Sequence, residues 1–448
     1  MISYSSAVEC LHKLGHELPQ LPARKFDLEH VRVLCHALAD TQHNFPSVLI
    51  AGTNGKGSTA ATLASILHAS SLHVGLYTSP HLLRVNERIR LDGQPIDDES
   101  FAAVCDRVSS TAARLVANGE LPHLPSFFET VTAMAFEYFS ASKVDIAVLE
   151  VGMGGRLDAT NIVEPILSVI TDIDLDHQKY LGNTIAEIAA EKAGILRKGV
   201  AAVTLPQHPE ANRVLGERMM ALGARAVNAA RNMASVAPGA SALVHASPTE
   251  TRFALSVLGT EVEIRSPLVG RHQIRNLALA ITAAEELAPR FSGITAASIA
   301  RGVAETSWPG RFQRLAANPR RPEIILDVAH NPAGAWALRS ALSELAGERP
   351  LVLLFAAMSD KAVEQMAEIL WPQMNHVVLT HVSGNPRAAT LEALNSIAQK
   401  LGVEYSVSDT VSQGLKIALE QASRLGPQAV VVIAGSIYLA GEAMPLLS

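Results

Sequence analysis

A glycine-rich stretch near the start of the chain carries the clearest chemical signal. The run Gly52-Thr-Asn-Gly-Lys-Gly-Ser-Thr59 combines three glycines with one lysine and several hydroxyl groups. Glycines allow backbone N–H groups to close around phosphate oxygens, and a helix that follows adds partial positive charge at its first turn. The ammonium of Lys56 can neutralise charge on β- and γ-phosphates, and a neighbouring hydroxyl can reach Mg²⁺. This stretch predicts a nucleotide phosphate loop.

The flanking residues predict the elements that such a loop needs. Residues 48–51 form an apolar run typical of a strand buried on both faces, and residues 60–68 have apolar side chains at helical spacing. Strand, loop and helix are the context that supports phosphate binding. The spacing differs from the usual phosphate loop, because only two residues separate the first two glycines and a glycine directly follows the lysine. The alternative interpretation is an ordinary glycine turn.

Three polar side chains lie at the ends of apolar runs that predict strands. They are Ser79, Glu150 and His177, at or after the runs 73–78, 145–151 and 166–173. Open α/β sheets bind ligands at the carboxyl ends of their strands. A glutamate at such a position costs free energy to bury unless it is paired or bound to a metal. A plain turn at Ser79 and a structural role for His177 are the alternatives.

Length and composition limit the classes of protein to consider. A chain of 448 residues predicts two or more domains, and 48% hydrophobic with 18% charged residues is typical of a globular protein. The net charge of −6 argues against nucleic-acid binding. The three cysteines form no C-x-x-C pair, and no apolar run approaches the roughly 20 residues that span a bilayer. We expect a cytoplasmic protein that does not bind membranes.

Several motifs together resemble those of one family. The phosphate-loop run is similar to that of the Mur ligase superfamily, and specifically of the folylpolyglutamate synthases and dihydrofolate synthases. Two further runs, Glu150-Val-Gly-Met-Gly-Gly-Arg-Leu-Asp-Ala-Thr-Asn161 and Asp327-Val-Ala-His-Asn-Pro332, resemble family motifs in the same order. The resemblance implies an α/β protein with an N-terminal P-loop NTPase-like Mur ligase central domain and a smaller C-terminal Rossmann-like α/β domain.

The resemblance also implies an ATP site with Mg²⁺. Nine residues would bind ATP: Thr53, Asn54, Gly55, Lys56, Gly57, Ser58, Asn276, Arg311 and Asp327. In this reading Asn276 contacts the adenine edge and Arg311 a phosphate, for which an amide and a guanidinium are suited. The metal ligands would be Ser79, Glu150 and His177. The imidazole is unusual in this set, because Mg²⁺ prefers oxygen ligands.

Lys192 and His330 complete the implied catalytic set with Lys56. Lys192 lies in Glu191-Lys-Ala-Gly-Ile195, where relatives carry a carbamylated lysine. Carbamylation converts a cation into an anionic, carboxylate-like group, which suits the neighbourhood of Mg²⁺. The alternative is a solvated helix lysine. His330, with Ser436 and Tyr438, is also expected near the glutamate substrate.

The resemblance also implies a set of folate-binding residues. They would be Leu28, Ser126, Phe127, Phe128, Glu129, Leu157, Asp158 and Ala159. Relatives carry threonine where this chain has Ser126, which retains the hydroxyl and loses a methyl group. Paired phenylalanines are more often core residues than ligand contacts, and Leu28 also fits a simple helix start.

The chain divides into two expected domains, with an ATP-binding domain over residues 1–307 and a glutamate-ligase domain over 308–448. A linker at about 306–312 contains Trp308-Pro-Gly-Arg-Phe312, in which Pro and Gly interrupt regular structure. After it, expected strands at 323–329, 351–357, 376–382 and 429–435 alternate with helices, which predicts a mostly parallel sheet. Residues 200–265 predict an antiparallel subsheet with surface loops.

The implied reaction is ATP-dependent amide formation through an acyl phosphate. The substrates would be ATP, L-glutamate and either dihydropteroate or a reduced folate, and we expect a monomer. The sequence leaves open which of the two folate activities is present, how long the polyglutamate grows and which folate is preferred. Two alternatives are a Mur-type ligase for a UDP-sugar peptide and a P-loop protein without ligase activity.

Overall fold

The computed structural model describes residues 2–15, 27–234, 245–246, 249–319, 321–345 and 347–447. These residues form two compact units, each described here by itself. The first comprises Met1–Ala242, Ala254–Ile264 and Arg275–Thr306, and the second comprises Leu243–Phe253, Arg265–Ile274 and Ser307–Ser448.

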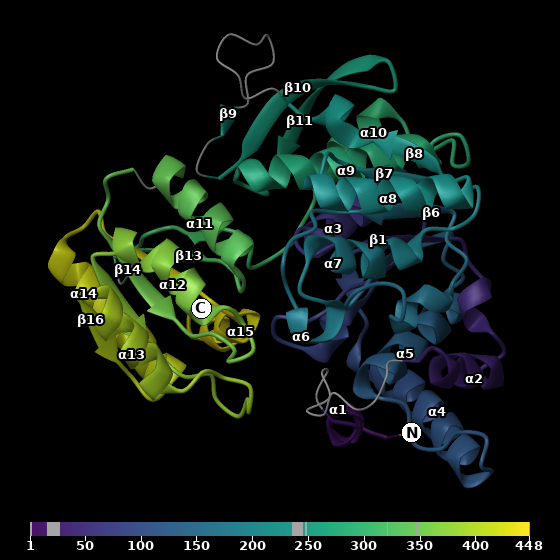
Figure 1. Cartoon of the computed structure of the whole chain (residues 1–448), viewed down its shortest axis with the longest axis horizontal. Helices are drawn as coiled ribbons and strands as arrows, with labels where there is room; N and C mark the ends of the chain where they lie inside the picture. The colour runs from purple at the N-terminus through teal and green to yellow at the C-terminus, as the bar shows by residue number, and fades with distance from the viewer. Residues whose placement is uncertain are drawn as a thin grey trace. The chain divides into compact units, whose positions relative to one another are not determined.

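An eight-stranded sheet organises the first unit, in the order β4-β3-β2-β5-β1-β6-β7-β8. Figure 1 labels its strands β1, β6, β7 and β8. The strands are β1 (Ser47–Ala51), β2 (Val74–Tyr77), β3 (Ile89–Leu91), β4 (Gln94–Pro95), β5 (Ile146–Glu150), β6 (Leu167–Ile170), β7 (Ala201–Thr204) and β8 (Arg225–Asn228). Strands β2, β5, β1, β6, β7 and β8 pair in parallel, whereas β3 and β4 add an antiparallel edge. The carboxyl ends of the parallel strands therefore share one edge.

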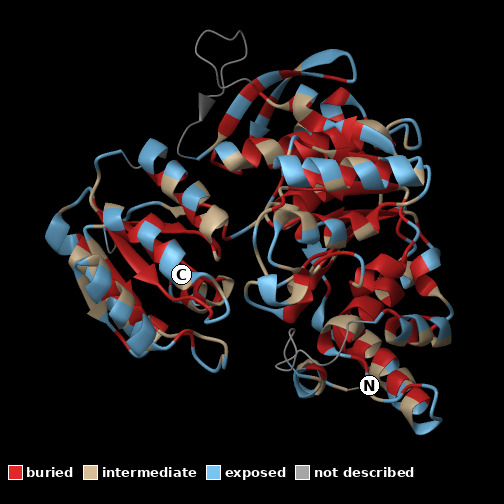
Figure 2. Cartoon of the chain, viewed as in Figure 1, coloured by how far each residue is buried: buried red, intermediate tan, exposed pale blue. Residues whose placement is uncertain are grey.

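Burial explains the apolar runs of the central strands. Every residue of β1, β2, β5 and β6 is buried, as Figure 2 shows in red. Helices cover both faces of a parallel sheet, so its strands need apolar side chains on both sides. The helix after β1, α3 (Lys56–Ala69), is buried along most of its length because it packs on β2 and β5 and also on α10 (Ala296–Ala304).

The other helices of the first unit come before, between and after the sheet strands along the chain. They are α1 (Tyr4–Lys13), α2 (Glu29–Ala37), α4 (Asp98–Ala117), α5 (Phe127–Ala141), α6 (Gln178–Leu181), α7 (Ile185–Lys192), α8 (Pro209–Leu222) and α9 (Arg271–Leu287). Helices α2, α4 and α5 pack together and extend the apolar core beyond the sheet.

The prediction of an antiparallel subsheet over residues 200–265 is wrong for the first half of this segment. Strands β7 and β8 extend the main sheet in parallel, with α8 between them. The antiparallel part consists of β9 (His245–Ala246), β10 (Thr251–Val257) and β11 (Thr260–Ser266). Four-residue strands carry too little periodicity to reveal the direction of their neighbours.

The second unit contains a six-stranded sheet in the order β12-β13-β17-β14-β15-β16. Its strands are β12 (Gln313–Leu315), β13 (Glu323–Leu326), β14 (Leu351–Phe355), β15 (His376–Leu379), β16 (Tyr405–Val407) and β17 (Val430–Ala434). All pairs are parallel except that of β12 with β13. Helices α11 (Pro332–Leu345), α12 (Val363–Leu370), α13 (Leu391–Leu401), α14 (Val411–Leu425) and α15 (Ile437–Ala443) alternate with the strands, as the sequence predicts.

Within the residues that the structure describes, no helix has both the length and the apolar character needed to cross a membrane.

Candidate active site

The phosphate loop joins the end of β1 to the first turn of α3. Gly55 caps the helix with a φ of +85°, a left-handed conformation that glycine adopts without strain. A Cβ at Gly55 would overlap the side-chain oxygen of Asn276, which is itself 4% exposed on α9. The structure thus brings the Asn276 amide, which is expected to bind adenine, against Gly55 of the loop. The two residues are 221 positions apart in the sequence.

The backbone of the loop is held by the segment that follows β6. The N–H groups of Thr53 and Asn54 donate to the Asp172 carbonyl at 2.8 and 3.1 Å. Both residues were expected to bind ATP, but these two N–H groups already have a partner. Helix N-termini bind anions through the N–H groups of their first turn, so the first turn of α3 is the expected phosphate contact.

Two lysine ammonium groups meet at one carbonyl of the loop. Lys56 Nζ donates to the carbonyl oxygens of Gly52 and Thr53 at 3.0 and 3.3 Å. Lys192 Nζ, from the last residue of α7, donates to the same Gly52 oxygen at 2.8 Å. Lys192 is 3% exposed, so the alternative of a solvated helix lysine is wrong. The buried lysine lies beside the predicted phosphate site.

Glu150 and Ser79 lie together at the carboxyl edge of the sheet. Glu150 ends β5, between β1 and β2, and is 4% exposed. The Ser79 N–H donates to Glu150 Oε2 at 3.2 Å, so the Ser79 backbone lies beside the carboxylate. His177 follows β6, caps the N-terminus of α6 with a φ of +50°, and has its Nε2 3.9 Å from the Asp176 carboxylate. All three expected metal ligands thus follow strands of the same sheet edge.

The donors present fit Mg²⁺ better than a metal that needs an all-protein cage. Among the described residues, no group of three or more His, Cys, Asp or Glu side chains could hold a metal ion. The buried Glu150 carboxylate and the Ser79 hydroxyl would supply oxygen donors, and Mg²⁺ usually completes its shell with waters and substrate phosphates. The site therefore suits a magnesium ion that arrives with a nucleotide.

The glycine loop after β5 is fixed by Asp158. One carboxylate oxygen of Asp158 accepts the Met153 N–H at 3.0 Å, and the other accepts the N–H and hydroxyl of Thr160 at 3.0 and 2.6 Å. Burial raises the pKa of this carboxyl, and the same hydrogen bonds counteract the rise. Asp158 was expected to bind folate, and in this structure its carboxylate shapes the loop. Leu157 is half-buried beside it and Ala159 is buried.

The segment Ser126–Glu129 combines a helix cap with two aromatic rings. Ser126 and Glu129 form a capping box at the start of α5, in which Glu129 Oε2 accepts the Ser126 N–H at 2.8 Å. Phe127 is 5% exposed, whereas Phe128 is half-buried and so close to Gly152 that a Cβ there would lie 2.6 Å from its ring. Phe128 thus connects the helix start to the glycine loop.

Arg88 is a buried residue of this region that sequence reasoning missed. It is 1% exposed, its guanidinium lies 5.1 Å from the centre of the Phe127 ring, and its Nε donates to His81 Nδ1 at 2.9 Å. Burial lowers the pKa of His81. Nothing in the local pattern around Arg88 marks it as buried. Leu28, also expected at the folate, is buried immediately before α2.

In the second unit, Asp327 forms a hydrogen bond with the end of the linker expected at about 306–312. Its two carboxylate oxygens accept the N–H groups of Phe312 and Ala329, each at 2.8 Å. Phe312 has a φ of +48°, and this hydrogen bond holds its unusual backbone conformation. Burial raises the pKa of Asp327, while the positive charge of Arg311 acts in the opposite direction. The carboxylate predicted to bind nucleotide therefore has a clear internal role.

The expected glutamate-binding residues lie at the ends of β13 and β17. His330 Nδ1 donates to the Val328 carbonyl at 2.9 Å, which orients the ring. Ser436 is buried and caps α15, where its hydroxyl accepts the Tyr438 N–H at 3.1 Å. These strands are neighbours in the sheet, so the residues share one edge.

Two domain families match the chain. Residues 116–284 match the Mur ligase middle domain, and residues 310–437 match the glutamate ligase domain of Mur ligases. A folylpolyglutamate synthase of Lacticaseibacillus casei is 35% identical over 430 residues, which cover 95% of both chains. The fold and the matched domains thus define a Mur-type ligase.

Solved structures agree over the whole length. The Mycobacterium tuberculosis folylpolyglutamate synthase complexed with ADP and AMPPCP aligns with a TM-score of 0.86 and 32% identity, covering 99% of this chain and 98% of that one. An Escherichia coli protein, FolC, in complex with DHPP and ADP, aligns with a TM-score of 0.81 and 29% identity, covering 100% and 98%. The chain belongs to the folylpolyglutamate synthase/dihydrofolate synthase family. The predicted family and fold class are confirmed.

Proposed function

We propose that this chain is an ATP-dependent ligase that adds L-glutamate to a folate acceptor, either dihydropteroate or the γ-carboxylate of tetrahydrofolate polyglutamates. The observation that carries the proposal is full-length similarity, 35% identity over 95% of the chain, to a folylpolyglutamate synthase. The phosphate loop, the buried Glu150 and the glycine loop agree with it, because all three lie at the ligand-binding edge of one sheet. We take the enzyme to be cytoplasmic and monomeric.

The reaction requires two nucleophilic displacements. An oxygen of the acceptor carboxylate forms a bond to the γ-phosphorus of ATP while the bond to ADP breaks, which gives an acyl phosphate. The amine nitrogen of glutamate then attacks the acyl carbon, inorganic phosphate leaves, and the amine loses a proton. No protein nucleophile is needed, so the chain contributes positioning and electrostatic stabilisation.

Lys56 and the first turn of α3 would stabilise the phosphates, and Asn276 would contact adenine. Ser79, Glu150 and His177 would hold Mg²⁺, which neutralises phosphate charge when bound. In the second unit, Arg311 and Asp327 would serve the nucleotide, and His330, Ser436 and Tyr438 the glutamate. The boundary at 307/308 and the linker at about 306–312 are part of this proposal.

The folate acceptor would lie against the rings and loop described above. Phe128 is half-buried and contacts Gly152, so its exposed part is available to stack on a flat pterin ring. Phe127 is buried, with the Arg88 guanidinium 5.1 Å from its ring centre, and the ring beside Phe128 is that of Tyr77, 6.1 Å away between centres. Leu28, Ser126, Glu129, Leu157, Asp158 and Ala159 would complete the pocket, with Asp158 acting through the shape of the glycine loop.

One assay distinguishes this function from its alternatives. The purified chain is incubated with ATP, glutamate and one of three acceptors, namely dihydropteroate, tetrahydrofolate or a UDP-muramoyl peptide, and ADP release is measured. We expect acceptor-dependent ADP release with at least one of the two folates. Release with the UDP-muramoyl peptide alone, or release that needs no acceptor, would contradict the proposal. Comparing the two folates also shows which activity is present.

Glu150→Gln tests the magnesium ligand. The substitution retains the volume of the side chain and removes the negative charge that a divalent cation requires. We expect the Mg²⁺ concentration for half-maximal activity to rise at least about tenfold, since loss of metal-site partners typically costs 10- to 100-fold in affinity. The measurement is a Mg²⁺ titration of ADP release at fixed ATP.

Glu137→Gln provides the matched control for this titration. Glu137, on α5, is also a buried carboxylate of the first unit, but it pairs with Arg107 of α4 at 2.9 Å. Its neutralisation should leave the Mg²⁺ dependence unchanged. If Glu150→Gln gives the same titration curve as this control, Glu150 is a structural strand-end residue and not a metal ligand.

A further inference from the structure

A short segment after β6, residues 171–174, forms hydrogen bonds with the phosphate loop. In addition to the two N–H groups that bond the Asp172 carbonyl, the Thr53 hydroxyl donates to the Asp174 carbonyl at 3.0 Å. Gly52 approaches Thr171 so closely that a Cβ at position 52 would overlap the threonine hydroxyl. The shape of the phosphate loop therefore depends on where this segment lies.

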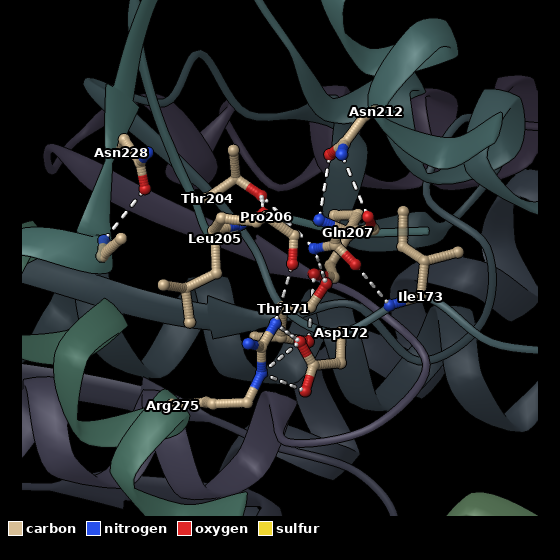
Figure 3. Close-up of polar contacts among 12 residues, drawn as sticks. Thr171, Asp172, Ile173, Thr204, Leu205, Pro206, Gln207, Asn212, Asn228 and Arg275 are labelled. Atoms are coloured by element: carbon tan, nitrogen blue, oxygen red, sulfur yellow. Dashed lines mark hydrogen bonds and ion pairs between the residues drawn. The ribbon is translucent and has the colours of Figure 1, made fainter. Parts of the chain in front are cut away.

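Arg275, on α9, fixes the segment through the side chain of Asp172 (Figure 3). Arg275 Nε donates to Asp172 Oδ2 at 2.9 Å and Nη2 donates to Oδ1 at 2.6 Å. Nη2 also donates to the Pro206 carbonyl at 3.1 Å. The side chains of Arg275 and Asp172 are 28% and 35% exposed, so solvent weakens their attraction. Two parallel bonds from a planar guanidinium nevertheless give a defined geometry.

Gln207 holds the segment from the opposite side. Its side-chain oxygen accepts the Ile173 N–H and its amide donates to the Thr171 carbonyl, both at 3.0 Å. Asn212 in turn bonds the backbone N–H and carbonyl of Gln207, each at 2.9 Å. Figure 3 shows these contacts around the segment. With its backbone bonded on both sides, the segment transmits the position of Arg275 to the loop.

The residue after Arg275 contacts the phosphate loop directly. Asn276 lies against Gly55, whereas Arg275 reaches the loop through Asp172. Two consecutive residues of one helix therefore reach neighbouring points of the loop, Asn276 at Gly55 and Arg275, through Asp172, at Thr53 and Asn54. A displacement of this part of α9 would change the distance between the adenine-side amide and the phosphate-binding turn.

We propose that Arg275 and Asp172 are positioning residues that set the affinity for ATP, by fixing the start of α9 relative to the phosphate loop. We call this pair the Arg275–Asp172 latch. It does not need to touch the nucleotide, since it acts through Asn276 and through the loop backbone. The inference rests on the proposed function to the extent that it takes these two elements as the nucleotide site.

The test is a double-mutant cycle with Arg275→Met and Asp172→Asn. We expect each variant to raise the Kd for ADP and the KM for ATP about tenfold, because the latch organises ground-state binding. The KM values for glutamate and for the folate, and kcat, should stay within about twofold. The double variant should be no worse than either single variant, because both remove the same contact. Arg275→Lys, which retains one charged donor, should recover part of the affinity.

Arg225→Met is the matched control. Arg225 on β8 forms an ion pair with Glu286, which lies on the same helix α9 three turns after Arg275. Losing this pair should leave ADP affinity unchanged. Thermal unfolding identifies variants that fail to fold, and Arg275→Lys then replaces Arg275→Met in the comparison.

Several results would overturn the latch. Equal effects of Arg275→Met and Arg225→Met, additive effects in the double variant, or a fall in kcat with unchanged ADP affinity would each do so. Failure of the proposed function looks different: the wild-type chain would bind ADP and yet ligate no glutamate, and the ADP titrations would still decide the latch. A wild-type chain that binds no ADP would contradict both.

Discussion

Lys56→Ala is expected to lower kcat/KM for ATP by at least about 100-fold, or roughly 2.7 kcal/mol of transition-state stabilisation. The side chain is half-buried at the first turn of α3, where its ammonium is held by the carbonyls of Gly52 and Thr53. When the γ-phosphoryl group is transferred, a positive charge at this position neutralises the developing negative charge. Alanine is a good helix residue, so the fold should persist.

The measurement is steady-state ADP release with saturating folate and glutamate, together with circular dichroism to confirm folding. Lys198→Ala serves as control, because Lys198 is an exposed lysine of the same unit. Its removal should leave activity within about twofold. Wild-type turnover by Lys56→Ala would show that the phosphate-loop assignment is wrong.

The phosphate loop was predictable because its signal is local. A buried strand, a glycine turn and a helix are each encoded by the residues that form them. β1 and α3 contain the expected strand and helix, although α3 begins at Lys56, four residues before the expected start. The same is true of the second unit, where the strand expected at 351–357 is β14 (Leu351–Phe355) and α11 (Pro332–Leu345) precedes it in the expected alternation. Alternating elements with short connections predict a parallel sheet directly.

Contacts between distant residues were not predictable in this way. Asp172 and Arg275 are partners although many elements separate them in sequence, and no sequence pattern pairs the two residues. Glu129 and Asp158 were assigned to folate by resemblance. In the structure the Glu129 carboxylate caps α5, and the Asp158 carboxylate bonds the backbone of the glycine loop. Short polar side chains satisfy nearby backbone groups as readily as they bind a ligand, and sequence pattern alone does not separate the two uses.

Lys192→Ala tests the least intuitive assignment of the site. As an ammonium, Lys192 shares the Gly52 carbonyl with Lys56, so the charge of a buried lysine would lie beside the like charge of a half-buried one. A carbamate formed from the neutral amine and CO₂ would replace one of these positive charges with a negative one. Such a group attracts Lys56 and suits a neighbouring magnesium ion. We expect Lys192→Ala to lose at least about 100-fold in kcat/KM, comparable to the loss of a preorganised charged group elsewhere.

Rescue distinguishes a carbamate from a structural ammonium. A small carboxylic acid such as acetate can occupy the space vacated in Lys192→Ala and restore the negative charge, so added acetate should recover part of the activity. Lys56→Ala should not respond to acetate, since the charge it lacks is positive. Lys192→Arg adds a second test, because a guanidinium can donate to the Gly52 carbonyl but does not form a carbamate. If Lys192→Arg is active and acetate leaves Lys192→Ala unchanged, the lysine acts as a cation that braces the phosphate loop.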